Sequence, residues 1–297
     1  MRNPINYLRR LYQGLRRVGD LDFRTRSWER INFALARGAA GAGLRRIDET
    51  DPRSWEFSGF SQNCEDGIID HLLSRAKRQN RYFIEIGASD GLENNTSWLA
   101  LVRRFSGLMI DGDPARTQQC RQFIGALNLG LQTVAMRVTR ETAAEALRLA
   151  VHKDPDVFVL DIDGLDYYVA EALFAAGLRP KIVVVEYNSA LGPDASLTVE
   201  YKSDFDYWSA HPSRLYYGVS INGWCRLLGR LGYQFITVEQ NGVNAFFADR
   251  AEFDPDFLKN IRGINFQENF AQRLQHGSDW QGQRERIKDC KFVEIDS

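Results

Sequence analysis

The sequence has few of the residues that staple small domains or bind structural metals. Its 297 residues include only four cysteines and four histidines. Because no two cysteines form a C-x-x-C pair, neither a disulfide framework nor a structural zinc site is supported. We therefore expect structural or incidental thiols and a reducing, cytoplasmic location.

Long apolar runs are also missing. No stretch approaches the roughly 20 residues that a membrane-spanning helix needs. Arginines interrupt the apolar positions of the amino terminus, which argues against a secretory signal. With 44% hydrophobic and 26% charged residues, the composition is typical of one large globular domain with additions.

Charge is unevenly distributed along the chain. Residues 1–46 hold 11 arginines and three acidic residues, whereas the rest has more acidic than basic residues. Apolar residues at helical spacing between positions 5 and 18 lie opposite arginines, which predicts a basic amphipathic helix. Such a helix can lie on an anionic membrane, bind a partner, or pack on its own domain. Nucleic acid is disfavoured as a partner, because the body is acidic and has no recognition motif.

Two glycine-rich stretches predict turns or joints. Residues 36–43, rich in Gly and Ala, predict a flexible joint after the basic arm. Residues 82–91, YFIEIGASDG, predict a strand, a glycine turn and then a helix from about residue 94 to 104. α/β proteins hold nucleotides at such turns, although a lone Gly-x-x-x-Gly also fits an ordinary tight turn.

The alternation of strands and helices continues along the chain. Further strands are predicted at 107–111, 131–138, 157–161 and 181–186, and helices at about 61–77, after Pro114, at 141–150 and at 167–176. His71, in the first of these helices, is predicted to lie at the surface. Strands as uniformly apolar as 181–186 are covered on both faces, which predicts a mostly parallel α/β sheet between two layers of helices.

The carboxyl portion changes in character. Residues 189–217 predict a long loop rich in aromatic residues, and a helix is predicted at 220–231. The strands 233–238 and 243–248 flank Asn241-Gly242, which predicts a β-hairpin. We divide the chain into a basic helical arm (1–50), a main domain (51–252) and a carboxyl-terminal extension (253–297).

Several short motifs resemble those of S-adenosylmethionine-dependent methyltransferases, and their order resembles the FkbM-type branch. They are FIEIGASDG from residue 83, FSQNCEDG from 60, DGLENNT from 90, DIDG from 161, VEYN from 185, GPD from 192 and GVNAFF from 242. The resemblance covers about residues 58–250 and implies a Rossmann-like class I methyltransferase fold. The chain departs from the pattern at Cys64, where a small residue is expected, and lacks an obvious adenine-reading acid after the third strand.

The resemblance implies a set of residues that contact S-adenosylmethionine. Glu85 would face the methionyl amine, and Asp111 would accept both ribose hydroxyls unless it is only a turn residue. The full implied set is Glu85, Gly87, Ser89, Asp90, Gly91, Asn95, Asp111 and Asp161. An NAD-dependent oxidoreductase is a competing interpretation, but the Gly-x-Gly-x-x-Gly fingerprint of dinucleotide binding is missing.

Acidic residues follow two neighbouring predicted strands. Asp161 and Asp163 follow one, and Glu186 and Asn188 follow the next, so their side chains should converge at one edge of the sheet. Four oxygen ligands suit Mg²⁺. Two interpretations stay open: a metal that activates a substrate hydroxyl, as in the loosely similar TylF-type sugar methyltransferases, or direct hydrogen bonds from the acids.

The aromatic residues between 201 and 217 suit a sugar-like acceptor or an anchored loop. His211 is the histidine placed to act as a base, and Asp161 or Asp163 could also take the proton. We expect an O-methyltransferase acting on a glycan or glycan-like hydroxyl, with peripheral membrane contact through residues 1–46. The contrasting hypothesis is a non-catalytic binding protein with the same fold.

Overall fold

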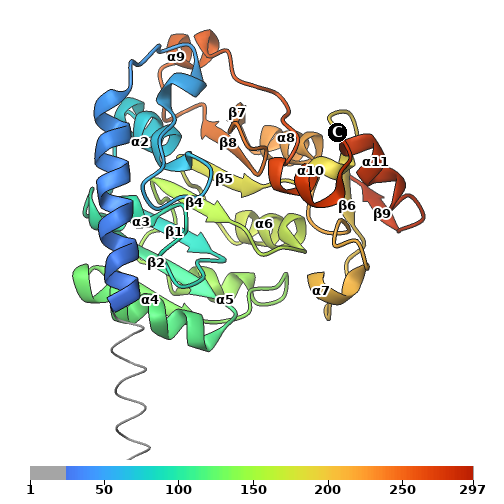
Figure 1. Cartoon of the computed structure of the whole chain (residues 1–297), viewed down its shortest axis with the longest axis horizontal. Helices are drawn as coiled ribbons and strands as arrows, with labels where there is room; N and C mark the ends of the chain where they lie inside the picture. The colour runs from blue at the N-terminus through green and yellow to red at the C-terminus, as the bar shows by residue number, and fades with distance from the viewer. Residues whose placement is uncertain (1–24, 297) are drawn as a thin grey trace, which may run out of the picture.

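Seven strands form one central sheet in the computed structural model, which describes residues 25–296. Figure 1 shows how the strands and helices are arranged. The order is β3-β2-β1-β4-β5-β8-β7. Strands β1 to β5 pair in parallel, whereas β8 is antiparallel to both β5 and β7. The strands are β1 (Tyr82–Ile86), β2 (Ser106–Asp111), β3 (Leu131–Ala135), β4 (Val157–Leu160), β5 (Ile182–Glu186), β7 (Tyr233–Val238) and β8 (Asn244–Asp249). This arrangement confirms the predicted Rossmann-like class I methyltransferase fold, including its antiparallel hairpin.

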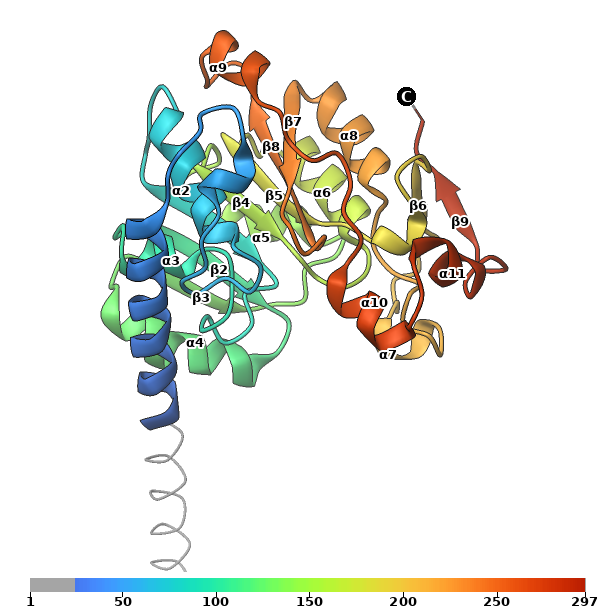
Figure 2. The same ribbon diagram turned by 45° about the horizontal axis from the view of Figure 1, so that its top comes forward.

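Helices cover both faces of the sheet (Figures 1 and 2). One apolar cluster packs a helix at residues 25–44, called here the arm helix, together with α2, α3, α4 and α9 on one face. A second cluster packs α5, α6 and α8 on the other face. The bounds are α2 (Glu65–Arg75), α3 (Ser97–Leu101), α4 (Pro114–Leu127), α5 (Ala143–Arg148), α6 (Asp166–Ala175), α8 (Ile221–Arg230) and α9 (Pro255–Asn260). Burial from both sides explains why β4 and β5 are uniformly apolar.

The segment 189–217 is more ordered than the predicted long loop. It contains η2 (Ser189–Leu191), β6 (Leu197–Val199) and α7 (Tyr207–Ala210). Strand β6 pairs antiparallel with β9 (Phe292–Glu294) from the carboxyl-terminal extension. The remaining helices of that extension are α10 (Phe270–His276) and α11 (Trp280–Glu285). Strand β6 depends on pairing with a strand almost a hundred residues away. The residues of segment 189–217 by themselves therefore do not predict it.

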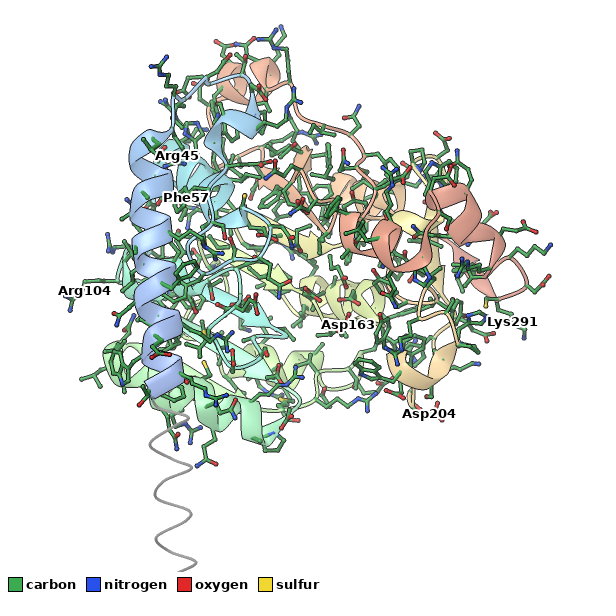
Figure 3. All side chains as sticks on the ribbon, in the orientation of Figure 1. Arg45, Phe57, Arg104, Asp163, Asp204 and Lys291 are labelled. Atoms are coloured by element: carbon green, nitrogen blue, oxygen red, sulfur yellow. The ribbon has the colours of Figure 1, made fainter. Side chains whose placement is uncertain are left out.

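The Gly/Ala-rich residues 36–43 are helical, which corrects the predicted flexible joint. A Cβ at Gly38 would lie 2.3 Å from the Trp98 ring, and one at Gly41 would lie 3.0 Å from Cβ of Phe57. The small residues therefore let the arm helix pack closely on the domain; Figure 3 labels Phe57 beside this helix. The predicted amphipathic helix at residues 5–18 lies outside the described residues.

His71 is buried at 7% exposure, which corrects its predicted surface position. Its ring stacks on Trp55 with a centroid distance of 4.3 Å. The 3-10 helix η1 (Pro52–Trp55) brings Trp55 onto this side of α2. The four cysteines, all within the described part, are free thiols, and no helix in residues 25–296 is long and apolar enough to cross a bilayer.

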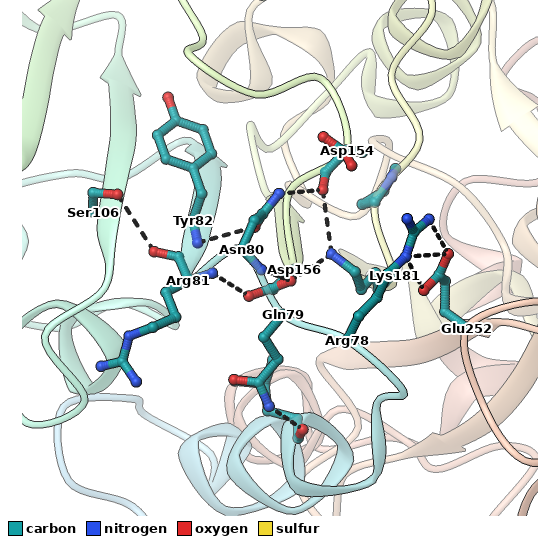
Figure 4. A network of polar contacts seen from close by, with 12 residues as sticks. Arg78, Gln79, Asn80, Arg81, Tyr82, Ser106, Asp154, Asp156, Lys181 and Glu252 are labelled. Carbon is teal, nitrogen blue, oxygen red and sulfur yellow. Dashed lines mark hydrogen bonds and ion pairs between the residues drawn. The ribbon is translucent and has the colours of Figure 1, made fainter.

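A buried ion pair ties together strands at the amino edge of the sheet, opposite the strand ends discussed next (Figure 4). Lys181 Nζ lies 2.5 Å from Oδ1 of Asp156. The same carboxylate accepts backbone N–H bonds from Asn80 and Arg81, which precede β1. Because the carboxylate has cationic and N–H partners, its burial is compensated. This network fixes the starts of β1, β4 and β5 relative to one another.

Candidate functional site

A cavity of about 1200 Å³ lies at the carboxyl edge of the sheet. Residues at or just after the carboxyl ends of β1 to β5 line it, and further lining residues come from the arm helix, segment 189–217 and α10. Figure 3 labels Asp163 between the carboxyl ends of the strands and the region that contains α7 and α10. Open α/β sheets bind ligands at this edge.

The turn after β1 passes directly against the end of β4. Gly87 has a φ of +93°, and a Cβ there would lie 1.6 Å from the carbonyl oxygen of Asp161. Only glycine fits such an approach. Ser89, with a φ of 50°, and Asp90 come next, and all three line the cavity. The predicted glycine turn therefore lies at the predicted edge.

Asp111 ends β2 and also lines the cavity. Its Oδ2 accepts a hydrogen bond from the backbone N–H of Ser89 at 2.8 Å, and its Oδ1 accepts one from Asp113 at 2.8 Å. These bonds fix the carboxylate, which has about four acceptor positions in all. The remaining positions suit two ligand hydroxyls.

Glu85, Gly91 and Asn95, three members of the predicted cofactor set, do not line the cavity, and their contact with the cofactor stays a prediction. Alternation along β1 turns Glu85 toward the face covered by α3, where it accepts hydrogen bonds from Nδ2 of Asn94 (2.6 Å) and the backbone N–H of Asn95 (3.1 Å). Burial raises the pKa of Glu85 to about 7. Gly91, with a φ of +75°, packs against Cys120. Glu85 thus holds the loop after β1.

Asp161, Asp163 and Glu186 converge as the sequence predicted, and we call them the acidic cluster. One carboxylate oxygen from each lies within 4.8 Å of the others. Asp166 shapes the turn between them, because its carboxylate accepts N–H bonds from Ile162 and Gly164 at 3.0 and 2.9 Å. All three members of the acidic cluster line the cavity.

Electrostatics in the acidic cluster favour a bound proton or cation. Burial raises the pKa of Asp161 and of Glu186 well above the ordinary range, and repulsion among the carboxylates raises both further. The pKa of the more open Asp163 is also raised, because the cavity walls limit its hydration. Oε2 of Glu186 is buried without a hydrogen-bond partner. Mg²⁺ takes carboxylate oxygens as ligands, so these three residues fit the predicted metal.

Asn188 does not belong to this cluster, which corrects the fourth predicted ligand. Its amide group donates to the carbonyl oxygens of Leu215 (2.7 Å) and Tyr217 (2.9 Å), and its oxygen accepts from the N–H of Ala190. The side chain is fully buried and caps η2. Its role is to hold the segment 189–217 against β5.

His211 is not brought to the acidic cluster either. It does not line the cavity, and its Nδ1 lies 2.8 Å from Oγ of Ser213 within the same turn. Of the residues predicted to act as a base, Asp161 and Asp163 are therefore the ones that lie in the acidic cluster. The aromatic residues that do line the cavity, called here the aromatic wall, are Phe205, Tyr207, Trp208 and Tyr217. Tyr201 and Tyr216 instead bond to Glu141 and to the carbonyl oxygen of Lys291.

Two groups of lining residues escaped the sequence analysis. The first comprises the cations Arg30, Arg116 and Arg137, and the second comprises the amides that α10 and its N-cap residue supply, Asn269, Gln272 and Gln275. Gln272 Nε2 donates to the Tyr217 hydroxyl at 2.8 Å, which joins α10 to the aromatic wall. Only Arg116 had a local signal, because it follows Asp113 at the start of α4. The others reach the cavity through contacts between distant segments.

No protein family model and no curated protein matches the chain. Among solved structures, the chain is similar to the cofactor-bound Rv0187 from MTB, at 16% identity over 75% of this chain and 90% of that one, with a TM-score of 0.44. It is similar to an O-methyltransferase from Bacillus cereus in complex with SAH, at 15% identity, 74% and 89% coverage and a TM-score of 0.39. It is also similar to a SAM-dependent methyltransferase from Geobacter sulfurreducens in complex with S-adenosyl-L-homocysteine, at 14% identity over 66% of this chain and 69% of that one, with a TM-score of 0.37. The FkbM-type assignment stays a prediction.

Proposed function

We propose that the chain is an S-adenosylmethionine-dependent O-methyltransferase that acts on a hydroxyl of a glycan or glycan-like acceptor. The observation that carries the proposal is the acidic cluster, with its carboxylate oxygens within 4.8 Å of one another, directly beside the Gly87 turn. The turn and Asp111 supply a nucleotide-binding edge. The acids supply proton acceptors where a transferred methyl group would lie.

The reaction needs a nucleophile and a place for one proton. An oxygen–carbon bond forms between the acceptor hydroxyl and the methyl group, the sulfur–methyl bond breaks, and the sulfonium becomes a neutral thioether. Because a hydroxyl is a weak nucleophile, its proton has to leave to a base during transfer. Asp161 and Asp163 are the acids suited to this step, and a raised pKa matches a carboxylate to general-base work.

The acceptor assignment is supported by the walls of the cavity. Aromatic rings from Tyr207 and Trp208 and amides from Gln272 and Gln275 line it. Apolar faces with polar tips, combined with amides, suit a neutral polyhydroxylated molecule. Acidic lining residues outnumber the three arginines, which disfavours an anionic acceptor.

Calorimetric titration with S-adenosylmethionine tests the cofactor, and we expect a saturable isotherm. Heat changes no larger than dilution at millimolar cofactor would contradict the proposal. For the acceptor, methyl-labelled cofactor is incubated with glycan extracts. The label should appear in carbohydrate and survive mild base, because methyl ethers resist the hydrolysis that removes methyl esters. Base-labile label, or label on protein, would exclude the proposed acceptor, and cofactor binding without any turnover would favour a binding protein.

Asp161, Asp163 and Glu186 are the residues that would hold Mg²⁺, which when bound lowers the pKa of a coordinated hydroxyl. We expect a chelator to abolish turnover and added magnesium to restore it. Undiminished turnover in the chelator would remove the metal from the proposal and leave direct hydrogen bonding by the acids.

A further inference from the structure

Arg30 of the arm helix reaches the cavity from outside the main domain. Its side chain is 47% exposed, and its guanidinium lies 3.3 Å from Oδ2 of Asp90 and 3.5 Å from Oε2 of Glu93, both in the loop after β1. The arm helix is held firmly behind it: Ile31 and Ala34 are buried in the core, and Arg37 Nη2 donates to the carbonyl oxygen of Gly59 at 2.6 Å.

Two of the three arginines that line the cavity contact the loop after β1, and the third contacts Phe205. Arg116 lies near Asp113 and near Oγ of Ser89, beside Asp111. Arg137 Nη2 donates to the carbonyl oxygen of Phe205 on the aromatic wall, at 2.6 Å. No lysine lines the cavity within residues 25–296. Arg30 and Arg116 therefore both lie by the loop after β1: Arg116 is on the side of Asp111, and Arg30 is on the side of the arm helix, at Asp90 and Glu93.

A cofactor sulfonium carries three groups, and the proposed function, on which this inference rests, accounts for two. The adenosyl group extends toward Asp111, and the methyl group toward the acidic cluster. The amino-acid tail is left to run along the loop after β1, where it needs a cation for its carboxylate and an anion for its ammonium. Arg30 and Asp90, already paired, offer both charges.

We propose that Arg30 binds the carboxylate of the cofactor's amino-acid tail, and that the arm helix is thereby a positioning element of the catalytic site. Arginine suits this role because its planar fork matches a carboxylate. The buried contacts of Ile31 and Ala34 hold the guanidinium in place before the ligand arrives, which limits the entropy lost on binding.

Two ligands that differ in the tail test the assignment on the full-length protein. S-adenosylhomocysteine has the amino-acid tail, and 5′-methylthioadenosine has only a methyl group in its place. Each is titrated calorimetrically into the wild type and into Arg30→Ala, Arg30→Lys and, as a control on an exposed arginine beyond the arm helix, Arg46→Ala. Thermal melts of all four proteins show whether the fold is intact.

We expect Arg30→Ala to weaken S-adenosylhomocysteine binding about tenfold or more, as for loss of a charged hydrogen bond, and to leave methylthioadenosine binding unchanged. Arg30→Lys should recover part of the loss, and Arg46→Ala should change neither ligand. If Arg30→Ala weakens the binding of both ligands equally, or leaves S-adenosylhomocysteine affinity unchanged, the proposed role of Arg30 is overturned and the proposed function is not affected. If the wild type binds neither ligand, the proposed function fails and the inference fails with it.

Discussion

Asp161 and Glu186 show how burial changes the chemistry of a carboxyl group. Two ionised carboxylates this close repel each other, and limited hydration makes each charge more costly. Burial and mutual repulsion therefore raise the pKa of both carboxyl groups well above the ordinary range. This property makes the acidic cluster suitable for proton transfer.

The first prediction is that Asp161→Asn affects rate more than cofactor binding. An amide keeps the shape of the side chain but cannot take a proton, so kcat should fall about 100-fold or more, in the range of lost general-base catalysis. Cofactor affinity should change far less. The measurement pairs turnover on the active glycan fraction with calorimetry, and Asp204→Asn, on an exposed residue outside the cavity lining, is the control. Retained kcat in Asp161→Asn would show that the proton leaves elsewhere.

The second prediction concerns Glu56, which is half-buried and unrelated to the cavity lining. Burial, and then repulsion by Glu239, raises its pKa to about 8 from 4.5. A raised pKa in the folded state means that the stabilising contribution is complete below the unfolded pKa and is lost as the pH rises through about 8. Ionisation of Glu56 should therefore weaken the fold in alkaline solution.

Glu56→Gln removes that ionisation. Its melting temperature should match the wild type near about pH 4 and exceed it by a few degrees near about pH 9. Glu145→Gln, on an exposed residue of α5, should behave as the wild type at both values. If the melting temperature of Glu56→Gln exceeds that of the wild type by the same amount at both pH values, packing and not charge is responsible for the difference.

At the scale of elements, the arm helix shows how glycine can serve close packing. Gly38 and Gly43 both lie in the helix, but a Cβ at Gly38 would meet Trp98 at 2.3 Å and the backbone of Gly59 at 3.0 Å, whereas a Cβ at Gly43 has nothing within 4 Å. The same substitution therefore has opposite consequences at the two positions.

The third prediction compares Gly38→Ala with Gly43→Ala. Alanine favours a helix over glycine by roughly 1 kcal/mol, so Gly43→Ala should raise the free energy of unfolding by up to about that amount. Gly38→Ala should lower it by roughly 1–3 kcal/mol, because overpacking displaces neighbouring groups. Urea unfolding at one pH measures both. Stabilisation by Gly38→Ala would show that the arm helix is not packed as described.

At the scale of the whole molecule, we propose that the basic arm draws the enzyme to anionic membranes, where lipid-linked glycan precursors would be accessible. Most of the arginines concerned lie outside the described residues, and Arg30 has the separate role inferred above. Each basic residue near such a surface contributes about 1 kcal/mol. Because salt screens these charges, attachment should weaken as ionic strength rises.

The fourth prediction follows from that proposal. Full-length protein with Arg9, Arg10, Arg16 and Arg17 changed to Gln should co-sediment with anionic vesicles much less than the wild type does. Substitution of Arg148 and Arg250, exposed on the body, should have a smaller effect. Equal sedimentation of all variants, or binding that salt does not weaken, would assign the arm to a protein partner or to the fold.

The sequence by itself determined the features that depend on near neighbours. Alternating apolar strands and helices, the Gly87 turn and the hairpin at Gly242 follow from local periodicity and backbone freedom, and the structure has all of them. The convergence of Asp161, Asp163 and Glu186 was also predictable, because adjacent parallel strands end at one edge.

The tertiary structure alone decided which other residues surround that edge. Glu85 is buried and accepts a hydrogen bond from the backbone of Asn95, and Asn188 donates to a backbone carbonyl oxygen. The His211 ring contacts Ser213 in the same turn. Arg30 and Gln272, from the two ends of the described chain, complete the cavity. Their positions follow from the packing of the arm helix and α10, and contacts between distant segments leave no periodic pattern in the sequence that forms them.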